Sequence, residues 1–182
     1  MLKALCSAMC LSLALIPVAP GRFPGHEPTT ARPIGALEEF QKLKSLAGTW
    51  KGSGPDGAVR VTFRVTSGGS ALLQEMVPEG RVADPSNGDD DPVTMIYVDG
   101  DQLTLVMYCD TGRNRPHMLG TRSPDGKRIE FVMVDFGGDR KHGIMDRATF
   151  SIVDAAHHTE GWDYVTTDGQ RQHAQLDLTR AP

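Results

Sequence analysis

The sequence predicts an all-β fold: an antiparallel up-and-down barrel of roughly ten strands, preceded by a short helix. From residue 49 onward, short segments of alternating apolar and polar residues follow one another, with turn signals every eight to twelve residues. Such alternation is typical of strands with one buried face. Three of the turns contain Asp-Gly, at residues 99–100, 125–126 and 168–169, and this pair favours tight hairpins. Closing the sheet into a barrel would remove its exposed edges.

The first 21 residues predict a secretory signal peptide. Lys3 precedes an apolar run that is too short to anchor a chain in a bilayer, and small residues and prolines follow it. Residues 22–35 are rich in Pro, Gly and Thr and predict a flexible leader. Residues 36–180 would then form a single barrel domain. We therefore expect an exported protein, periplasmic or secreted, and no stable membrane insertion of the mature chain.

The helix is expected over residues 37–46. Leu37, Phe40 and Leu43 recur at helical spacing, with glutamates near the start and lysines near the end, as the helix dipole favours. The strands are then expected at residues 49–53, 58–66, 70–77, 92–98, 102–109, 116–122, 127–135, 145–153, 159–166 and 170–179.

The turn at Asp168-Gly169 predicts a register for the last hairpin. A three-residue turn with a bulge pairs Trp162 with Ala174 and Glu160 with Leu176, which gives one largely apolar face. His173 then points outward, away from the lumen.

The same turn geometry, applied to the other hairpins, predicts which side chains share the interior face. These are Glu75, Val93, Met95, Leu103, Leu105, Met107, Cys109, His117, Phe131 and Trp162. In the hairpin around residues 66–70, a slip of one residue would bring Gln74 inside in place of Glu75.

Several of these residues are candidates for a ligand site. Glu75 and His117 would be polar groups in an apolar lumen, where they should pair or stay near the barrel mouth. Cys109 would act as a small apolar side chain or, beside His117, as a nucleophile. Arg113 and Arg115 could hold a carboxylate at the mouth. The candidate ligand-binding set is Glu75, Met107, Cys109, Arg113, Arg115, His117, Phe131 and Trp162.

The segment "LAGTWKGSG" resembles the opening of calycin-type barrels, namely lipocalins, fatty-acid-binding proteins and nitrobindins. The segments "GGSALLQEMVPEG", "VDGDQLTLVMYCDTGRNRPHM" and "HHTEGWDYVTTDGQ" resemble a bacterial lipocalin-like family of unknown function. This resemblance covers roughly residues 37–180 and implies a calycin-like barrel in which Trp50 plugs the closed end. The sequence differs from this family at three positions. The resemblance implies a histidine at Met107, a glutamine at Arg115 and an arginine at His117.

Composition narrows the classes of function. A net charge of −4 argues against nucleic-acid binding and against anionic membrane surfaces. Mature protein would keep one cysteine, Cys109, and so no intramolecular disulfide. No cofactor motif is present. The aspartate-rich residues 84–92 lack the ligand spacing of an EF-hand, and neighbouring His157 and His158 would face opposite sides of a strand, so no metal site is expected.

The sequence favours a small-molecule-binding barrel, monomeric or weakly dimeric, that holds an apolar or acidic-headed ligand in its lumen. Two alternatives stay open. One is a nitrobindin-like haem-binding protein. The other is a small hydrolase or isomerase that uses Glu75, His117 and Cys109.

Overall fold

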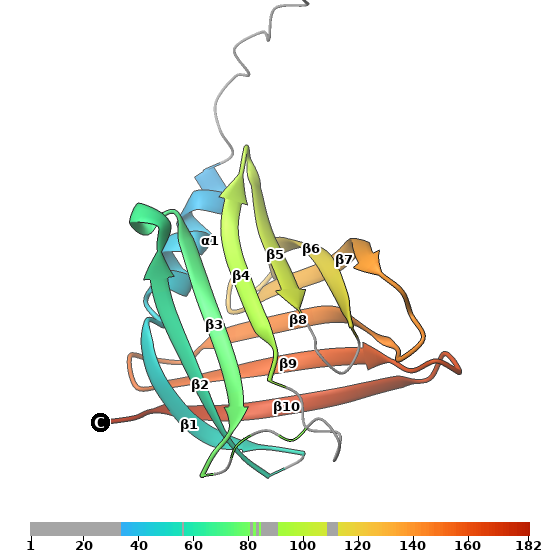
Figure 1. Ribbon diagram of the computed structural model, residues 1–182. Helices are drawn as coiled ribbons and strands as arrows, with labels where there is room; N and C mark the ends of the chain where they lie inside the picture. Colours follow the sequence, from blue (N-terminus) through green and yellow to red (C-terminus); the bar gives the residue numbers. More distant parts are fainter. Residues whose placement is uncertain (1–33, 56, 81, 83, 85–90, 109–112) are drawn as a thin grey trace, which may run out of the picture. The chain divides into compact units, whose positions relative to one another are not determined.

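The computed structural model describes residues 34–182 except 56, 81, 83, 85–90 and 109–112. As predicted, one α-helix precedes a closed antiparallel barrel of ten strands in which β10 pairs with β1 (Figure 1). The elements are α1 (Ile34–Lys44), β1 (Gly48–Gly54), β2 (Gly57–Thr66), the 3₁₀ turn η1 (Ser67–Gly69), β3 (Ala71–Pro78), β4 (Val93–Asp99), β5 (Gln102–Tyr108), β6 (Asn114–Arg122), β7 (Ile129–Gly138), β8 (Ile144–Ile152), β9 (His157–Val165) and β10 (Arg171–Arg180). Strands β8–β10 cross the direction of β2–β4 in Figure 1. No helix among the described residues has the length and hydropathy needed to cross a membrane.

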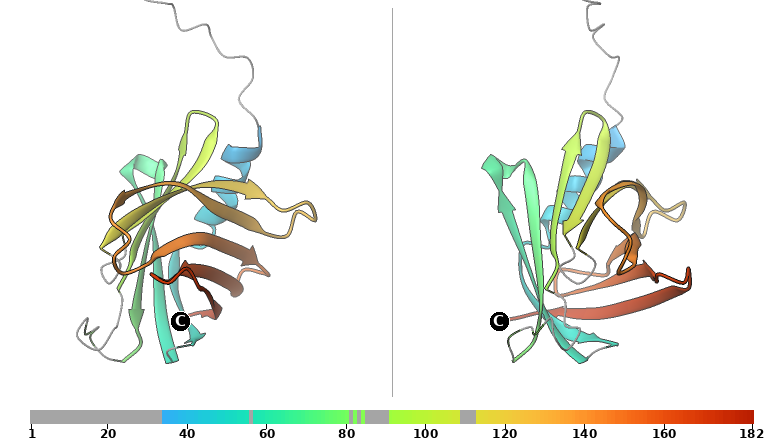
Figure 2. Two further views of the ribbon diagram at one scale, coloured as in Figure 1. Left: turned by 90° about the vertical axis from the view of Figure 1, so that its right-hand side faces the viewer. Right: turned by 45° about the vertical axis from the view of Figure 1, so that its right-hand side comes forward.

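Helix α1 closes one end of the barrel. Its apolar residues Phe40 and Leu43, and Leu46 just beyond it, belong to the same buried cluster as the interior strand residues. Trp50 at the start of β1 is fully buried, and its indole Nε1 donates a hydrogen bond to the carbonyl oxygen of Leu46, 2.7 Å away. Trp50 is therefore buried beside the segment that follows α1, as its expected place in the barrel requires. Figure 2 shows α1 beside the β4–β5 hairpin.

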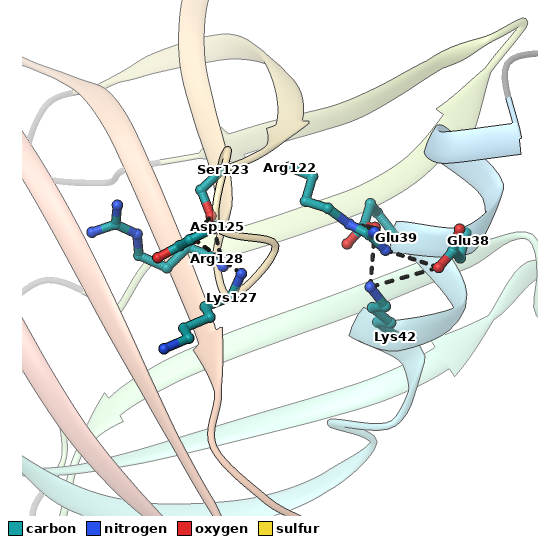
Figure 3. Close-up of polar contacts among 8 residues, drawn as sticks. All are labelled: Glu38, Glu39, Lys42, Arg122, Ser123, Asp125, Lys127 and Arg128. Atoms are coloured by element: carbon teal, nitrogen blue, oxygen red, sulfur yellow. Dashed lines mark hydrogen bonds and ion pairs between the residues drawn. The ribbon is translucent and has the colours of Figure 1, made fainter.

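Ion pairs attach α1 to the end of β6 (Figure 3). The Arg122 guanidinium donates to Glu38, at 2.8 Å, and to the buried carboxylate of Glu39. Lys42 donates to Glu39 from one turn along the helix, at 3.2 Å. The hydrogen bond from Arg122 lowers the pKa of Glu38, and the two glutamates raise the pKa of Arg122. The four charged side chains, Glu38, Glu39, Lys42 and Arg122, are here called the helix clamp, and each has a partner of opposite charge.

The turn after Arg122 carries its own short network, also drawn in Figure 3. The Asp125 carboxylate accepts hydrogen bonds from the Ser123 hydroxyl, at 2.6 Å, and from the Lys127 backbone N–H, at 3.1 Å. These bonds lower the pKa of Asp125. The Asx-type contacts fix the β6–β7 turn close to α1.

The hairpin registers differ from prediction wherever the loop holds an even number of residues. The β4–β5 turn has two residues, Gly100 and Asp101, so Val98 pairs with Leu103. Thr94 and Ile96 are therefore buried, and the predicted inward placement of Val93 and Met95 is wrong. The β2–β3 loop has four residues, and four more lie inside the backbone hydrogen bond from Ser123 to Arg128 that closes the β6–β7 turn, so both registers shift in the same way. In the β9–β10 turn the backbone hydrogen bond from Thr166 to Gln170 encloses the predicted three residues, and there Trp162 pairs with Ala174.

The barrel interior is packed mainly with large apolar side chains. Phe131, Phe150 and Trp162 meet edge to face, with ring centroids 5.7–5.8 Å apart between neighbours. Gly120 makes room for this packing, since a Cβ there would lie 2.6 Å from the Phe131 ring and 2.8 Å from Leu103. In so apolar an interior, a buried polar group needs a hydrogen-bond partner to offset its loss of contact with water.

Candidate ligand site in the barrel interior

Among the described residues, the strands place one fully buried carboxylate in the barrel interior, that of Glu160 on β9. Its Oε2 accepts hydrogen bonds from the Gln74 amide nitrogen, at 2.8 Å, and from the Trp162 indole nitrogen, at 3.0 Å. Its Oε1 lies 3.0 Å from His158 Nε2. Three nitrogen donors thus meet one carboxylate, which is how a buried charge is stabilised in an apolar surrounding.

The bond between Gln74 and Glu160 crosses the lumen. Gln74 is on β3 and Glu160 on β9, and β2, β1 and β10 lie between these strands in the sheet. The cluster of Gln74, His158, Glu160 and Trp162, here called the lumen cluster, therefore ties opposite walls of the barrel together.

The geometry assigns the hydrogens of the lumen cluster. An ionised carboxylate only accepts hydrogen bonds, so Gln74 must present its NH₂ to Glu160 and His158 must carry a hydrogen on Nε2. Gln74 Oε1 and His158 Nδ1 then take no part in the bonds to Glu160. Both atoms are buried and neither has a hydrogen-bond partner. In the neutral imidazole both atoms are acceptors.

Aromatic rings hold His158 in place. The Trp50 ring meets it edge to face at 4.3 Å between centroids, and the Phe63 ring lies 5.8 Å away. Arg180 covers the Trp50 ring, with its guanidinium carbon 4.2 Å from the centroid. The imidazole is thus oriented by Glu160 on one side and by two rings on the others, a rigid setting for its free nitrogen.

Five methionines belong to the barrel interior or pack against it. Met107 and Met118 are buried in the core, and Met76, Met133 and Met145 are partly buried against it. They come from five strands, β3 and β5–β8. The unbranched, polarisable methionine side chain adapts to different shapes, and proteins use it at adaptable binding surfaces.

Three of the eight predicted site residues are buried in the interior as expected: Met107, Phe131 and Trp162. Cys109 lies outside the described residues. Arg113, held at φ 51°, and Arg115 are both exposed. The Arg115 guanidinium covers Gly137 on the neighbouring strand rather than the lumen.

The predicted inward placement of Glu75 and His117 is wrong. The β2–β3 loop pairs Phe63 with Gln74, so Gln74 is inside and Glu75 is exposed, as the one-residue slip would require. The β6–β7 register pairs Gly120 with the inward Phe131, so His117, three residues before Gly120 on β6, is on the outer face, where it lies half-buried opposite Asp135. The described residues therefore do not assemble a Glu75–His117 pair in the lumen.

His157 and His173 also lie on the outer face. His173 is exposed and its Nδ1 lies 2.6 Å from the Asp163 carboxylate, so the predicted outward orientation is confirmed. His157 pairs with Asp177 on the outer face, opposite in direction to buried His158. Within the described parts of the chain, no three His, Cys, Asp or Glu side chains gather as a metal site would need.

Sequence reasoning placed Glu160 and Trp162 inside but did not select Gln74 and His158 as site residues. The signal was present for both. Gln74 was the side chain that a one-residue slip brings inward, and His158 precedes Glu160 by two residues on one strand, which puts both on the same face.

Comparison with known proteins supports the fold. No protein-family model matches the chain, and no curated protein matches its sequence. The solved structure of Rv2717c from M. tuberculosis is similar, with 18% identity, a TM-score of 0.58, and coverage of 79% of this chain and 97% of that one. A protein of unknown function from the DUF3598 family of Nostoc punctiforme has 9% identity and a TM-score of 0.44 over 76% of this chain and 49% of that chain. The likeness to Rv2717c fits a calycin-like barrel.

Proposed function

We propose that the protein binds a small, mainly apolar molecule in the barrel interior and recognises a hydrogen-bond donor on it through the lumen cluster. One observation carries this proposal: Gln74 Oε1 and His158 Nδ1 are buried and have no hydrogen-bond partner. When the imidazole is neutral with its hydrogen on Nε2, both atoms are acceptors. A buried polar group without a partner destabilises the fold by about 1–3 kcal/mol. A donor on a ligand would remove that penalty.

The chemistry of the lumen cluster also selects among ligands. The Glu160 carboxylate is already the acceptor of three nitrogens, so an acidic head beside it would meet a like charge in an apolar setting. An alcohol or amine head suits the two free acceptors. The methionines give the apolar body of the ligand a wall that can rearrange around it.

The proposal keeps the binding function expected from the sequence and narrows the ligand from acidic-headed to donor-headed. It is compatible with the resemblance to a bacterial lipocalin-like family and with the predicted export of the chain. The catalytic alternative receives no support, because Glu75 and His117 lie on the outer face.

The test uses two fluorescent probes, N-phenyl-1-naphthylamine and its N-methyl derivative, in which a methyl group replaces the hydrogen of the N–H donor. We expect the first to bind about tenfold more tightly, the effect of one net hydrogen bond. In Gln74→Leu this preference should shrink, whereas Glu75→Gln, one residue away on the outer face, should retain it. Equal affinity of both probes for the natural protein would contradict recognition of a donor. No binding of either would contradict the lumen site itself.

A further inference from the structure

A groove lies between the second half of α1, the β6–β7 turn and the end of β8. We call it the α1–β8 groove. Its volume is about 880 Å³, which is within the range of about 300–1,000 Å³ that small-molecule sites occupy. None of the four residues of the lumen cluster lines it. The groove is therefore a second place where a small molecule could lie.

One side of the α1–β8 groove is apolar. Ile129 at the start of β7 and Phe150 on β8 line it, and both belong to the buried core cluster. Ile152 is partly buried against the same cluster, and Val153, just beyond the strand, is 59% exposed. The apolar lining thus runs from the barrel core out to the surface. An apolar chain that lay along it would remove Ile152 and Val153 from water.

The other side of the groove carries three basic side chains, Lys42 on α1 and Lys127 and Arg128 on the β6–β7 turn (Figure 3). Lys42 is paired within the helix clamp, and Arg128 lies 3.5 Å from the Glu130 carboxylate. The Lys127 ammonium is different, because it makes no ion pair or hydrogen bond with another described residue. The groove thus offers one unpaired cation beside an apolar lining.

Hydrogen bonds fix the turn that carries Lys127 and Arg128. The Lys127 backbone N–H donates to the Asp125 carboxylate, at 3.1 Å, and the Arg128 backbone N–H donates to the Ser123 hydroxyl, at 3.0 Å. The Ser123 N–H donates in turn to the Arg128 carbonyl oxygen, at 2.9 Å. The turn therefore holds two cations against one carboxylate in a fixed backbone, and such preorganisation lowers the entropy cost of binding an anion.

We propose that the α1–β8 groove binds an amphipathic monocarboxylate, of the class of medium-chain fatty acids, with its carboxylate at Lys127 and its alkyl chain along Ile152 and Val153. The ammonium donates a charge-assisted hydrogen bond to the carboxylate, and the apolar lining covers the chain. The lumen disfavours such an acid, because the buried Glu160 carboxylate is already there. The inference does not depend on what the lumen binds.

Isothermal titration calorimetry of the full chain with decanoate, below the concentration at which micelles form, tests the proposal. The natural protein should bind decanoate more tightly than acetate, which has the same head without the chain. Lys127→Glu should weaken decanoate binding by about tenfold, because it turns an attraction into a repulsion. Arg64→Glu is the matched control. Arg64 on β2 is also exposed and without an ion pair among the described residues, and it lies outside the groove, so this variant should retain the affinity.

A ligand of opposite charge tests the assignment of the head. Decyltrimethylammonium has a similar chain on a cation, so the natural protein should bind it more weakly than decanoate, and Lys127→Glu should bind it more tightly than the natural protein does. Val153→Ser tests the chain. It shortens the apolar lining at an exposed position and should weaken both ligands by about threefold without changing their order.

Equal affinity of the natural protein and Lys127→Glu for decanoate would overturn the proposal, since the acid would then be bound away from the groove. No binding of decanoate below the micellar concentration would overturn it as well. Tighter binding of the cation than of decanoate by the natural protein would contradict Lys127 as the partner of the head.

Discussion

Strand β9 carries two carboxylates that each meet a histidine, Glu160 on its inner face and Asp163 on its outer face. Glu160 and His158 are both fully buried, whereas the side chain of His173 beside Asp163 is 57% exposed. Glu160 receives nitrogen donors from Gln74, Trp162 and His158, and Asp163 receives the cations Arg147, Arg171 and His173. A carboxylate–histidine pair thus occurs twice, once in the interior at Glu160 and once on the solvent-exposed face at Asp163, three residues further along β9.

The difference between the two pairs shows what burial adds. On the outer face, water and mobile arginines satisfy whatever the protein leaves open, so the cluster needs no further partner. In the interior nothing replaces a missing hydrogen bond, and two acceptors are open there. Without a ligand, the two open acceptors of the inner cluster lower the stability of the fold. For this reason we assign ligand binding to the inner cluster and only local stabilisation to the outer one.

The largest contrast is expected between Glu160→Ala and Asp163→Ala. The first leaves three buried N–H donors without an acceptor and should lower the free energy of unfolding by about 3–5 kcal/mol. The second removes surface ion pairs and should lower it by at most about 1 kcal/mol. Urea unfolding followed by tryptophan fluorescence and circular dichroism measures both. Equal losses would show that the inner cluster is not a buried charge network.

A smaller contrast is expected between Gln74→Leu and Glu75→Gln. Loss of the bond across the lumen should lower the free energy of unfolding by about 1–3 kcal/mol, since Glu160 keeps two of its donors. The outward Glu75 should change it by no more than about 0.5 kcal/mol. The pair also tests the β2–β3 register, because the reverse order of effects would place Glu75 in the lumen.

Much of the fold could be predicted from the sequence because each strand carries its own alternation of apolar and polar residues. The helix, the ten strands and the burial of Trp50 all follow from local signals. The site is harder, since it depends on register, and register depends on loop length. Glu75 and Gln74 have the same local pattern around them, and only the four-residue loop before β3 decides which one is inside.

The bulge between His117 and Met118 shows the same limit. An extra residue on β7 there interrupts the alternation of that strand, so Phe136 rather than Asp135 continues the face of Phe131 and Met133, and no turn residue in the sequence signals it. The last hairpin was predicted correctly because its Asp-Gly turn has the three-residue form assumed for it, so Glu160 and Trp162 were placed inside. Two of the four residues of the lumen cluster, Glu160 and Trp162, could thus be predicted, and both come from the hairpin whose turn has the assumed length.

The smallest effect is expected at the outer pair, for His173→Gln, and it should depend on pH. The hydrogen bond to Asp163 raises the pKa of His173 above its ordinary value. A histidine whose pKa is raised on folding stabilises the native state most below its unfolded pKa of about 6.5, and this stabilisation is lost as the pH rises through the folded pKa. The natural protein should therefore exceed the variant in thermal midpoint at about pH 5.5 and match it at about pH 8.5. The gap should be small, because solvent screens the exposed imidazole. A gap that widens towards high pH would contradict the assigned bond and, with it, the separation of the two carboxylates on β9 into an inner and an outer environment.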